Sequence, residues 1–329
     1  MNRRDILLAA LSSAALVPFA GRALAAGTPF KAALGWLPNN AYAGEVIALT
    51  KGYFAEAGLD VELIPGGPSA NPIQDLMGGA AEVAIGYAPQ IMYSVAKGVP
   101  LKSFAASYQK APLSFYSLKE KNINSVADWK GKRVGAAQSG VPQIKAVLAH
   151  NGLAFEDITF VQANVPALMQ DQVDLVAAWP TNLGQIKPIL EHPAGYNVQS
   201  IWDNGLQFQS NYYIARNDAL ASKSAELVAF LQAADKGWAW VADNIDEAAA
   251  LLAEYAPALN AEAEAASLRV AIPEYIYTDE TKTAGFGNVS ADRWQATLDT
   301  YTKLGEVPAM KASDVHDGSI LAAAKRTMR

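Results

Sequence analysis

Aromatic and amide side chains gather just after the first predicted strand of the chain. Trp36 follows that strand directly, and Asn39, Asn40 and Tyr42 continue a polar and aromatic loop that no core requires. An indole ring can stack on a flat ligand while asparagine amides read its edge. Two alternatives stay open at this point, because Trp36 could be a packing residue and both asparagines could cap the helix that follows.

Two further groups of this kind stand at strand ends. Gly86 and Tyr87 end another predicted strand, where a small residue lets a ligand approach the backbone and the tyrosine can stack or form a hydrogen bond. Gln138, Ser139 and Gly140 end a later strand and open a helix, whose free backbone amides suit a carbonyl or an anion. We expect both groups to contact the ligand.

The last candidates lie further along the chain. Trp179 ends another predicted strand, although a tryptophan there could equally be a core residue. Gln209 and Tyr212 lie where the chain is expected to cross between two lobes, and their polar groups could reach the ligand or satisfy hinge amides. The twelve residues named so far form the predicted ligand site.

None of these twelve side chains is basic. A sulfonate or nitrate in a dehydrated site normally calls for Arg or Lys, or for several amides at helix starts. Aromatic rings with amide and hydroxyl groups suit a flat, neutral heterocycle instead. The set therefore favours a neutral aromatic ligand over a charged one.

Composition argues against several other kinds of chemistry. The chain has no Cys, which excludes thiolate metal sites and cysteine nucleophiles, and its three histidines are far apart in sequence. We therefore expect no metal, no cofactor and no catalytic residue. Lys and Arg number 26 against 32 Asp and Glu, with no dense basic stripe, so nucleic acid is not an expected partner.

The elements that must position these residues alternate between strand and helix, the pattern of an α/β fold. From residue 224 onward the pattern changes to successive Ala-rich helices, a helical C-terminal tail. Strands are predicted at 30–35, 61–64, 83–85, 101–108, 133–136, 158–161, 175–178 and 198–201, and helices between them at 42–51, 72–78, 88–97, 141–151, 166–171 and 183–190.

One economical layout places these elements in two α/β lobes, with the second inserted into the first. We expect residues 26–110 and 213–329 in the first lobe and residues 111–212 in the second, joined by hinge crossings. Because ligands in open α/β sheets bind outside the carboxyl ends of strands, both lobes would face such ends toward one site.

Several runs of sequence carry a resemblance to a known family. They are KAALGWLPN at 31–39, AG at 43–44 and KGYFAEAGLDV at 51–61, with weaker matches at 131–135, 139–140, 174–175 and 178–180. These runs resemble the substrate-binding proteins of ABC importers for thiamine pyrimidine precursors and, in related branches, sulfonates, nitrate or riboflavin. The resemblance implies a type 2 periplasmic binding protein that closes on its ligand like a hinged clamp.

The same superfamily includes the fungal pyrimidine synthases, which carry a pyridoxal-phosphate lysine, a sacrificial histidine and a cysteine-rich iron-binding stretch. Aligned on the KGVP run at 97–100, this chain has Gly86 and Gln90 at the first two positions, and it has no Cys. It also departs from the pyrimidine-binding members at Ala41 and Tyr42, where an asparagine–histidine pair is common. We expect a binding protein rather than an enzyme.

The function expected from these observations is that of a periplasmic receptor for an ABC importer. Its small-molecule ligand is expected to be a thiamine-related aminopyrimidine, and its partner an ABC permease in the inner membrane. The resemblance implies a monomer. The alternatives are a sulfonate, nitrate or flavin ligand in the same fold, or a sensor module that closes on its ligand without transport.

The first residues predict export to the periplasm. Arg3 and Arg4 precede an apolar run at 6–20 that is too short to span a bilayer, and Ala23 to Ala25 supply small residues for cleavage. The paired arginines resemble a twin-arginine signal, while Asp5 leaves the general secretory route open.

We therefore expect residues 1–25 to be removed and the exported protein to begin at Ala26. Amino-terminal sequencing of protein recovered from the periplasm checks this directly. Recovery of periplasmic protein that still begins at Met1 would contradict it.

Overall fold

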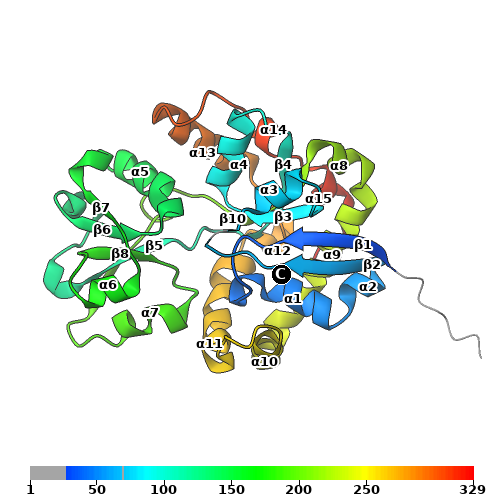
Figure 1. The fold of residues 1–329 in the computed structure, drawn as a ribbon, viewed down its shortest axis with the longest axis horizontal. Coiled ribbons are helices and arrows are strands. Elements are labelled where there is room, and N and C mark those ends of the chain that lie inside the picture. The colour runs from blue at the N-terminus through cyan, green and yellow to red at the C-terminus, as the bar shows by residue number, and fades with distance from the viewer. Residues whose placement is uncertain (1–26, 69) are drawn as a thin grey trace, which may run out of the picture.

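The computed structural model describes residues 27–68 and 70–329, and the predicted export signal at 1–25 lies outside the described residues. The described chain forms two five-stranded sheets, which Figure 1 shows side by side with helices around each. Within these residues no helix has both the length and the apolar character that crossing a bilayer requires. The helix-rich C-terminal region agrees with the predicted tail.

The first sheet has the strand order β2-β1-β3-β10-β4. β1 is parallel to β2 and β3, whereas β10 arrives late in the chain and runs antiparallel between β3 and β4. The carboxyl ends of β1 and β3 therefore share one edge, where Trp36 and Tyr87 follow. The bounds are β1 (Thr28–Ala33), β2 (Leu59–Ile64), β3 (Val83–Gly86), β4 (Leu101–Tyr108) and β10 (Ser210–Arg216).

The second sheet has the order β7-β6-β8-β5-β9. β6 is parallel to β7 and β8, and β5 runs antiparallel to both β8 and β9. The two sheets thus repeat one pattern, with a single antiparallel strand entering beside parallel ones. The bounds are β5 (Ser114–Leu118), β6 (Arg133–Ala136), β7 (Thr159–Gln162), β8 (Leu175–Ala178) and β9 (Tyr196–Ser200).

We call each sheet with the helices packed on it a lobe. In the second lobe, Figure 1 shows α5 on one face of the sheet and α6 and α7 on the other. The helices are α1 (Ala43–Thr50), α2 (Tyr53–Glu56), α3 (Pro72–Met77), α4 (Ala88–Ala96), α5 (Val141–His150), α6 (Val165–Met169), α7 (Leu183–Leu190), α8 (Asn217–Ser222), α9 (Ser224–Asp243), α10 (Ile245–Tyr255), α11 (Ala261–Ala271), α12 (Thr281–Ala284), α13 (Ala291–Lys303), α14 (Ala312–Val315) and α15 (Ser319–Ala323).

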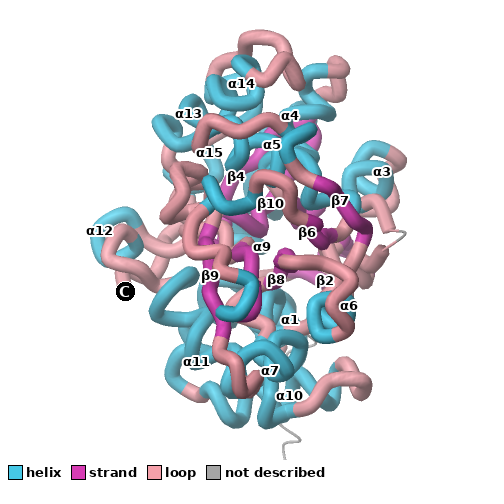
Figure 2. The backbone as a smooth tube through the Cα atoms, turned by 90° about the vertical axis from the view of Figure 1, so that its left-hand side faces the viewer, coloured by secondary structure: helices cyan, strands magenta, loops and turns pink. Residues whose placement is uncertain are grey.

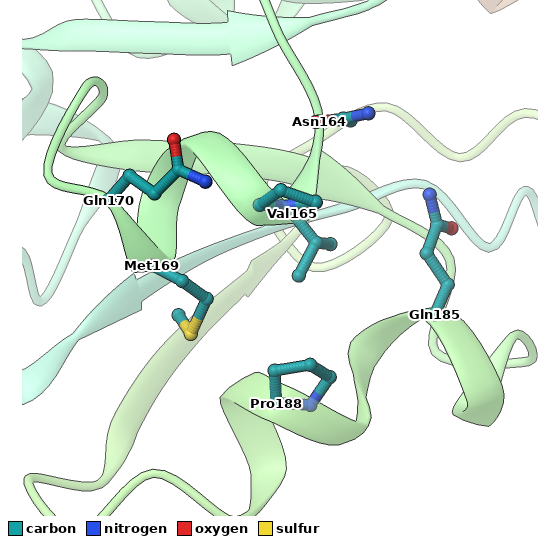
Figure 3. Close-up of a pocket in the computed structure, with 7 residues that line it drawn as sticks. Asn164, Val165, Met169, Gln170, Gln185 and Pro188 are labelled. Carbon is teal, nitrogen blue, oxygen red and sulfur yellow. The ribbon is translucent and has the colours of Figure 1, made fainter.

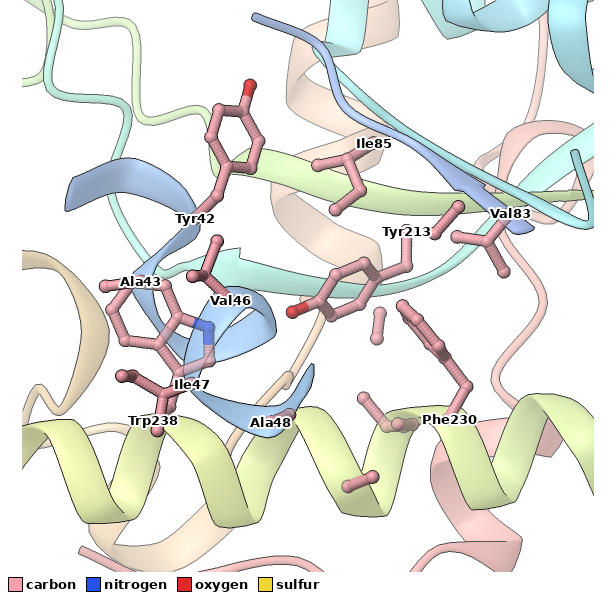
Figure 4. Packing of buried hydrophobic residues seen from close by; sticks show 14 of the residues in the cluster. Tyr42, Ala43, Val46, Ile47, Ala48, Val83, Ile85, Tyr213, Phe230 and Trp238 are labelled. Carbon is pink, nitrogen blue, oxygen red and sulfur yellow. The ribbon is translucent and has the colours of Figure 1, made fainter. Parts of the chain in front are cut away.

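The core of the first lobe forms where α9 packs across the sheet (Figure 4). Phe230 of α9 stacks on Phe30 of β1, with 5.3 Å between ring centroids. α9 also crosses α1 at very short range, because a Cβ on Gly237 would lie 2.0 Å from the carbonyl oxygen of Gly44. Glycine at this crossing lets the two backbones touch, and the neighbouring Trp238 fills the space beside Gly44.

Two buried glutamines fasten the two segments that connect the lobes. The Gln209 amide donates to the Gln109 side-chain oxygen at 3.0 Å and to the Asn288 carbonyl at 2.7 Å. Its own oxygen accepts from the Ser290 amide at 2.9 Å. The backbone adds a bond from the Ala111 amide to the Phe208 carbonyl at 2.8 Å. Both crossings, and the segment leading into α13, are therefore held as one unit.

The predicted elements agree with the observed ones in kind and nearly in length. β4, β6, β8 and α7 have the predicted bounds, and a tail helix predicted at 261–271 is observed as α11. β10 contains the segment at 212–216 that the sequence indicates as extended. The short helices α2, α8, α12, α14 and α15 were not predicted, and neither was the strand β5. Its Ser114 and Ser117 side chains bond the backbone carbonyls of Pro112 and Ile123, so polar residues are buried in a central strand without loss of hydrogen bonds.

Glu45 of α1 is a fully buried carboxyl group in the first-lobe core. One of its oxygens accepts a hydrogen bond from the Tyr213 hydroxyl, and the other has no partner among the described residues. Burial raises the pKa of Glu45 to about 7. The folded protein therefore binds this proton more tightly than the unfolded chain does.

The free energy of unfolding should consequently fall as pH rises from about 4.5 through 7, relative to a Glu45→Gln variant. A difference of 2.5 pKa units corresponds to a change on the order of 3 kcal/mol, fully expressed above the folded pKa. Urea unfolding of both proteins between pH 4.5 and 8 measures it. A stability difference that does not vary with pH would show that Glu45 ionises normally.

Candidate functional site

Aromatic side chains from the two lobes meet at one point. Trp179 follows β8 of the second lobe and packs edge-on against Tyr87 of the first, with ring centroids 6.0 Å apart and planes at 81°. It also contacts Tyr108, the last residue of β4, at 6.1 Å. We call Tyr87, Tyr108 and Trp179 the aromatic junction. It lies beyond the carboxyl ends of β3 and β8, where ligands bind in open α/β sheets.

Two hydroxyl groups are buried at this junction. The hydroxyls of Tyr108 and Thr181 lie near each other. Within the described part of the chain, neither makes a hydrogen bond of ordinary geometry. Burial raises the pKa of Tyr108 far above its usual value, so its hydroxyl stays protonated and able to donate. A polar group left without a partner costs free energy, and a ligand that bonds it recovers that cost.

The loop after β1 holds four predicted site residues in different ways. Trp36 is 40% exposed and free to meet a ligand. Asn39 caps the short 3-10 turn Asn40–Tyr42, since its side-chain oxygen accepts from the Ala41 amide at 2.9 Å. Asn40 is buried, and both its backbone and side-chain amides donate to Glu264 of α11, at 2.7 and 3.0 Å. The two asparagines therefore shape the loop.

Tyr42 and Tyr87 are placed together, whereas Gly86 is shielded. The ring of Tyr42 is buried in the core and its hydroxyl points away from that cluster (Figure 4). Burial, and then the nearby Tyr87 hydroxyl, raise its pKa well above the usual value. A Cβ on Gly86 would lie 2.7 Å from the side-chain oxygen of Gln90, which accepts from the Tyr87 amide at 2.9 Å. The Gln90 side chain therefore fills the space beside Gly86, and its hydrogen bond fixes the turn at Tyr87.

The second lobe presents an exposed turn from the carboxyl end of β6. Gln138–Gly140 form one 3-10 turn that leads into α5, and Gln138 and Ser139 are exposed. Neither side chain caps the helix. Their amide and hydroxyl groups are therefore accessible at the surface of the second lobe.

The side chains of Gln209 and Tyr212 already have partners within the protein. Every side-chain polar atom of Gln209 bonds another part of the chain, as described above. Tyr212 of β10 packs on Trp294 of α13, with 4.8 Å between ring centroids, and is 2% exposed. Successive strand residues face opposite sides of a sheet, and Tyr212 faces the core under α13. We leave both residues out of the proposed site.

A separate hollow of about 530 Å³ lies on the second lobe between α6 and α7. Figure 3 shows the side chains of Val165, Met169 and Pro188 around it, with three amide side chains at its margins. It contains none of the twelve predicted site residues.

Sequence reasoning missed three residues near the junction. Tyr108 ends a strand that was predicted correctly, so the rule that placed Tyr87 would also have found it. Thr181 comes two residues after Trp179. Tyr275 contacts Tyr108 at 6.1 Å from a turn that continues α11, and no local pattern marks it.

Solved structures share this architecture. The alkanesulfonate-binding protein SsuA from Xanthomonas axonopodis pv. citri superposes with a TM-score of 0.66, covering 89% of this chain and 100% of that one at 16% identity. This similarity confirms the predicted periplasmic binding protein fold, with two α/β lobes and a helical C-terminal region. At this level of identity it establishes the fold and not the ligand.

Relatives found by sequence have a higher identity to this chain than this solved structure has. The formylaminopyrimidine-binding protein of Halalkalibacterium halodurans is 29% identical over 279 residues, 80% of this chain and 82% of that protein. A 4-amino-5-hydroxymethyl-2-methylpyrimidine phosphate synthase of Saccharomyces cerevisiae, THI11, is 28% identical but matches only 43% of each chain. The model of the NMT1/THI5 like family matches residues 39–248. This match covers more than half of the chain and shows that the chain belongs to the NMT1/THI5 like family.

Proposed function

We propose that this protein is the periplasmic receptor of an ABC importer and that it binds a neutral aromatic heterocycle, a thiamine-related aminopyrimidine. The observation that carries the proposal is the aromatic junction, where Trp179 of one lobe packs on Tyr87 and Tyr108 of the other. If the lobes separate, these rings become two aromatic walls that face each other. A flat heterocycle would enter between them and draw the lobes together again.

The polar groups around the junction support a neutral ligand. Tyr108 and Thr181 offer hydroxyls, and Gln138 and Ser139 offer an amide and a hydroxyl at the edge of the second lobe. An aminopyrimidine presents ring nitrogens that accept and an amino group that donates, so uncharged groups of both kinds match it. No Arg or Lys belongs to this set, although a fully charged sulfonate or nitrate normally calls for one, or for several amides at helix starts.

The similarity to a formylaminopyrimidine-binding protein over most of both chains supports the same ligand class. We also propose that the chain is not a synthase. The position expected for a cofactor lysine is Gly86, and Gln90 uses its side chain to hold the Tyr87 turn. Export to the periplasm, an ABC permease as partner and a monomeric state complete the proposal. The lobe division predicted at 26–110 with 213–329 and 111–212 is proposed with one change, because residues 210–212 begin β10 and so belong to the first lobe.

Titration calorimetry of the mature protein with 4-amino-5-hydroxymethyl-2-methylpyrimidine tests the ligand, and small-angle scattering with and without it tests closure. We expect saturable binding and a smaller radius of gyration, because contacts from both lobes favour the closed state. Riboflavin, taurine and nitrate are the comparison ligands. Binding of taurine or nitrate in place of the pyrimidine would overturn the charge argument, and binding without compaction would overturn the placement at the junction.

The exposed Trp36 gives a direct test of the loop after β1. Trp36→Ala should weaken pyrimidine binding by about 1–3 kcal/mol, the range for loss of an aromatic anchor. The fold should be spared, because the ring is 40% exposed and contributes little to the core. Leu37→Ala is the matched control, since Leu37 is the exposed neighbour at 52% and has no proposed contact. Equal affinity of the Trp36 variant and wild type would remove this loop from the site.

A further inference from the structure

One carboxylate joins the two lobes away from the aromatic junction. Glu306 lies just after α13 in the first lobe, and one of its oxygens is 2.5 Å from the ammonium of Lys145, on α5 of the second lobe. Its other oxygen accepts from the Tyr93 hydroxyl of α4 at 3.1 Å. Both oxygens of one side chain are therefore used to connect two helices from different lobes.

The two helices that Glu306 connects, α4 and α5, both begin beside residues of the proposed ligand site. α4 begins at Ala88, directly after Tyr87, and α5 begins directly after the Gln138–Gly140 turn. Each helix thus starts at a proposed ligand-binding segment of its own lobe. A group that sets the spacing between α4 and α5 also sets the spacing between the two halves of the site.

The surroundings of the ion pair favour a defined geometry. The side chains of Lys145 and Glu306 are 34% and 25% exposed, so water screens the pair only in part. The Lys145 ammonium lies 5.8 Å from the centre of the Phe155 ring, and Tyr93 packs edge-on against Tyr301 of α13. Lys145 lowers the pKa of Glu306, which keeps the carboxylate charged at neutral pH.

The opposite flank has a different kind of interlobe contact. There the Leu183 amide at the start of α7 donates to the Ser267 hydroxyl of α11 at 3.1 Å. Figure 2 shows α7 and α11 at one end of the molecule and α4, α5 and α13 at the other. The α7 and α11 flank has this neutral hydrogen bond and a longer-range attraction between Lys187 of α7 and Glu262 of α11. The Glu306 flank has an ion pair within hydrogen-bond distance, so we expect it to respond more strongly to salt.

We propose that Glu306 is a positioning residue that stabilises the closed arrangement of the lobes by bridging Lys145 and Tyr93, and thereby sets ligand affinity without touching the ligand. The proposal rests on the proposed function for its ligand, but not for its effect on lobe spacing. An interaction made in only one of two states shifts the equilibrium by its own free energy.

The test is a set of matched charge variants. Glu306→Gln keeps the size and the acceptor for Tyr93 but loses the ion pair, and it should weaken binding of 4-amino-5-hydroxymethyl-2-methylpyrimidine about two- to fivefold. Lys145→Glu should weaken it further by repulsion. The double variant Lys145→Glu with Glu306→Lys should restore affinity. Glu56→Gln is the control, because Glu56 makes an exposed ion pair with Lys236 inside the first lobe.

A second readout needs no ligand. The chain has no Cys, so Lys97→Cys and Glu156→Cys introduce two unique and exposed labelling sites, one on each lobe. Energy transfer between two dyes should report a longer distance in Glu306→Gln than in wild type. High salt should lengthen the wild-type distance and leave that of Glu306→Gln unchanged.

The outcomes separate the two proposals. If the wild type ignores pyrimidines but its dye distance depends on Glu306 and salt, the ligand assignment fails and the role of Glu306 holds. If Glu306→Gln matches wild type in dye distance, or if the charge-swapped double variant stays as weak as Lys145→Glu, the role of Glu306 is overturned.

Discussion

The hydrogen bonds of Gln109 and Gln209 are the constraint on which the arrangement of the lobes depends. The two crossings would otherwise be separate connections that bend independently. The Gln209 side chain bonds Gln109, Asn288 and Ser290, so it ties both crossings to the segment before α13. Gln109 and Gln209 are buried, so a variant that removes one of them leaves a polar atom of the other without this hydrogen bond and away from water. The two crossings are thereby held together at one fixed centre.

That fixed centre explains how the site is assembled from both lobes. Trp179 reaches Tyr87 and Tyr108 only because β8 and β3 direct their carboxyl ends to the same junction. Glu306 and the contact between Leu183 and Ser267 then hold the lobes on two flanks around it. The aromatic junction, the paired crossings and the flanking contacts therefore connect the two lobes at separate places, and the proposed closure would have to change all of them together.

Local pattern predicted most of the fold, and it selected two of the three residues that meet at the aromatic junction. Strand ends identified Tyr87 and Trp179, because that rule depends only on where a strand stops. The same reasoning could not decide which way Tyr212 faces, since Tyr212 and Tyr213 are neighbouring aromatic residues that face opposite sides of β10, and nothing local distinguishes them. Asn40 donates to Glu264 of α11, a partner more than 200 residues away that no local pattern reveals. In β5 the buried Ser114 donates to a backbone carbonyl, and a polar residue of this kind does not suggest a buried strand.

The position of β10 has a consequence for how the chain acquires this fold. β10 completes the first sheet by inserting between β3 and β4, yet all of residues 109–209, including the whole second sheet, precede it in the chain. Until residue 216 has emerged, β3 and β4 lack the strand between them and expose unpaired backbone groups. The closing of that gap is a long-range event with a large entropic cost, which slows folding and lengthens the life of an open sheet edge. The first sheet therefore cannot be completed until residue 216, about two thirds of the way along the chain, is available.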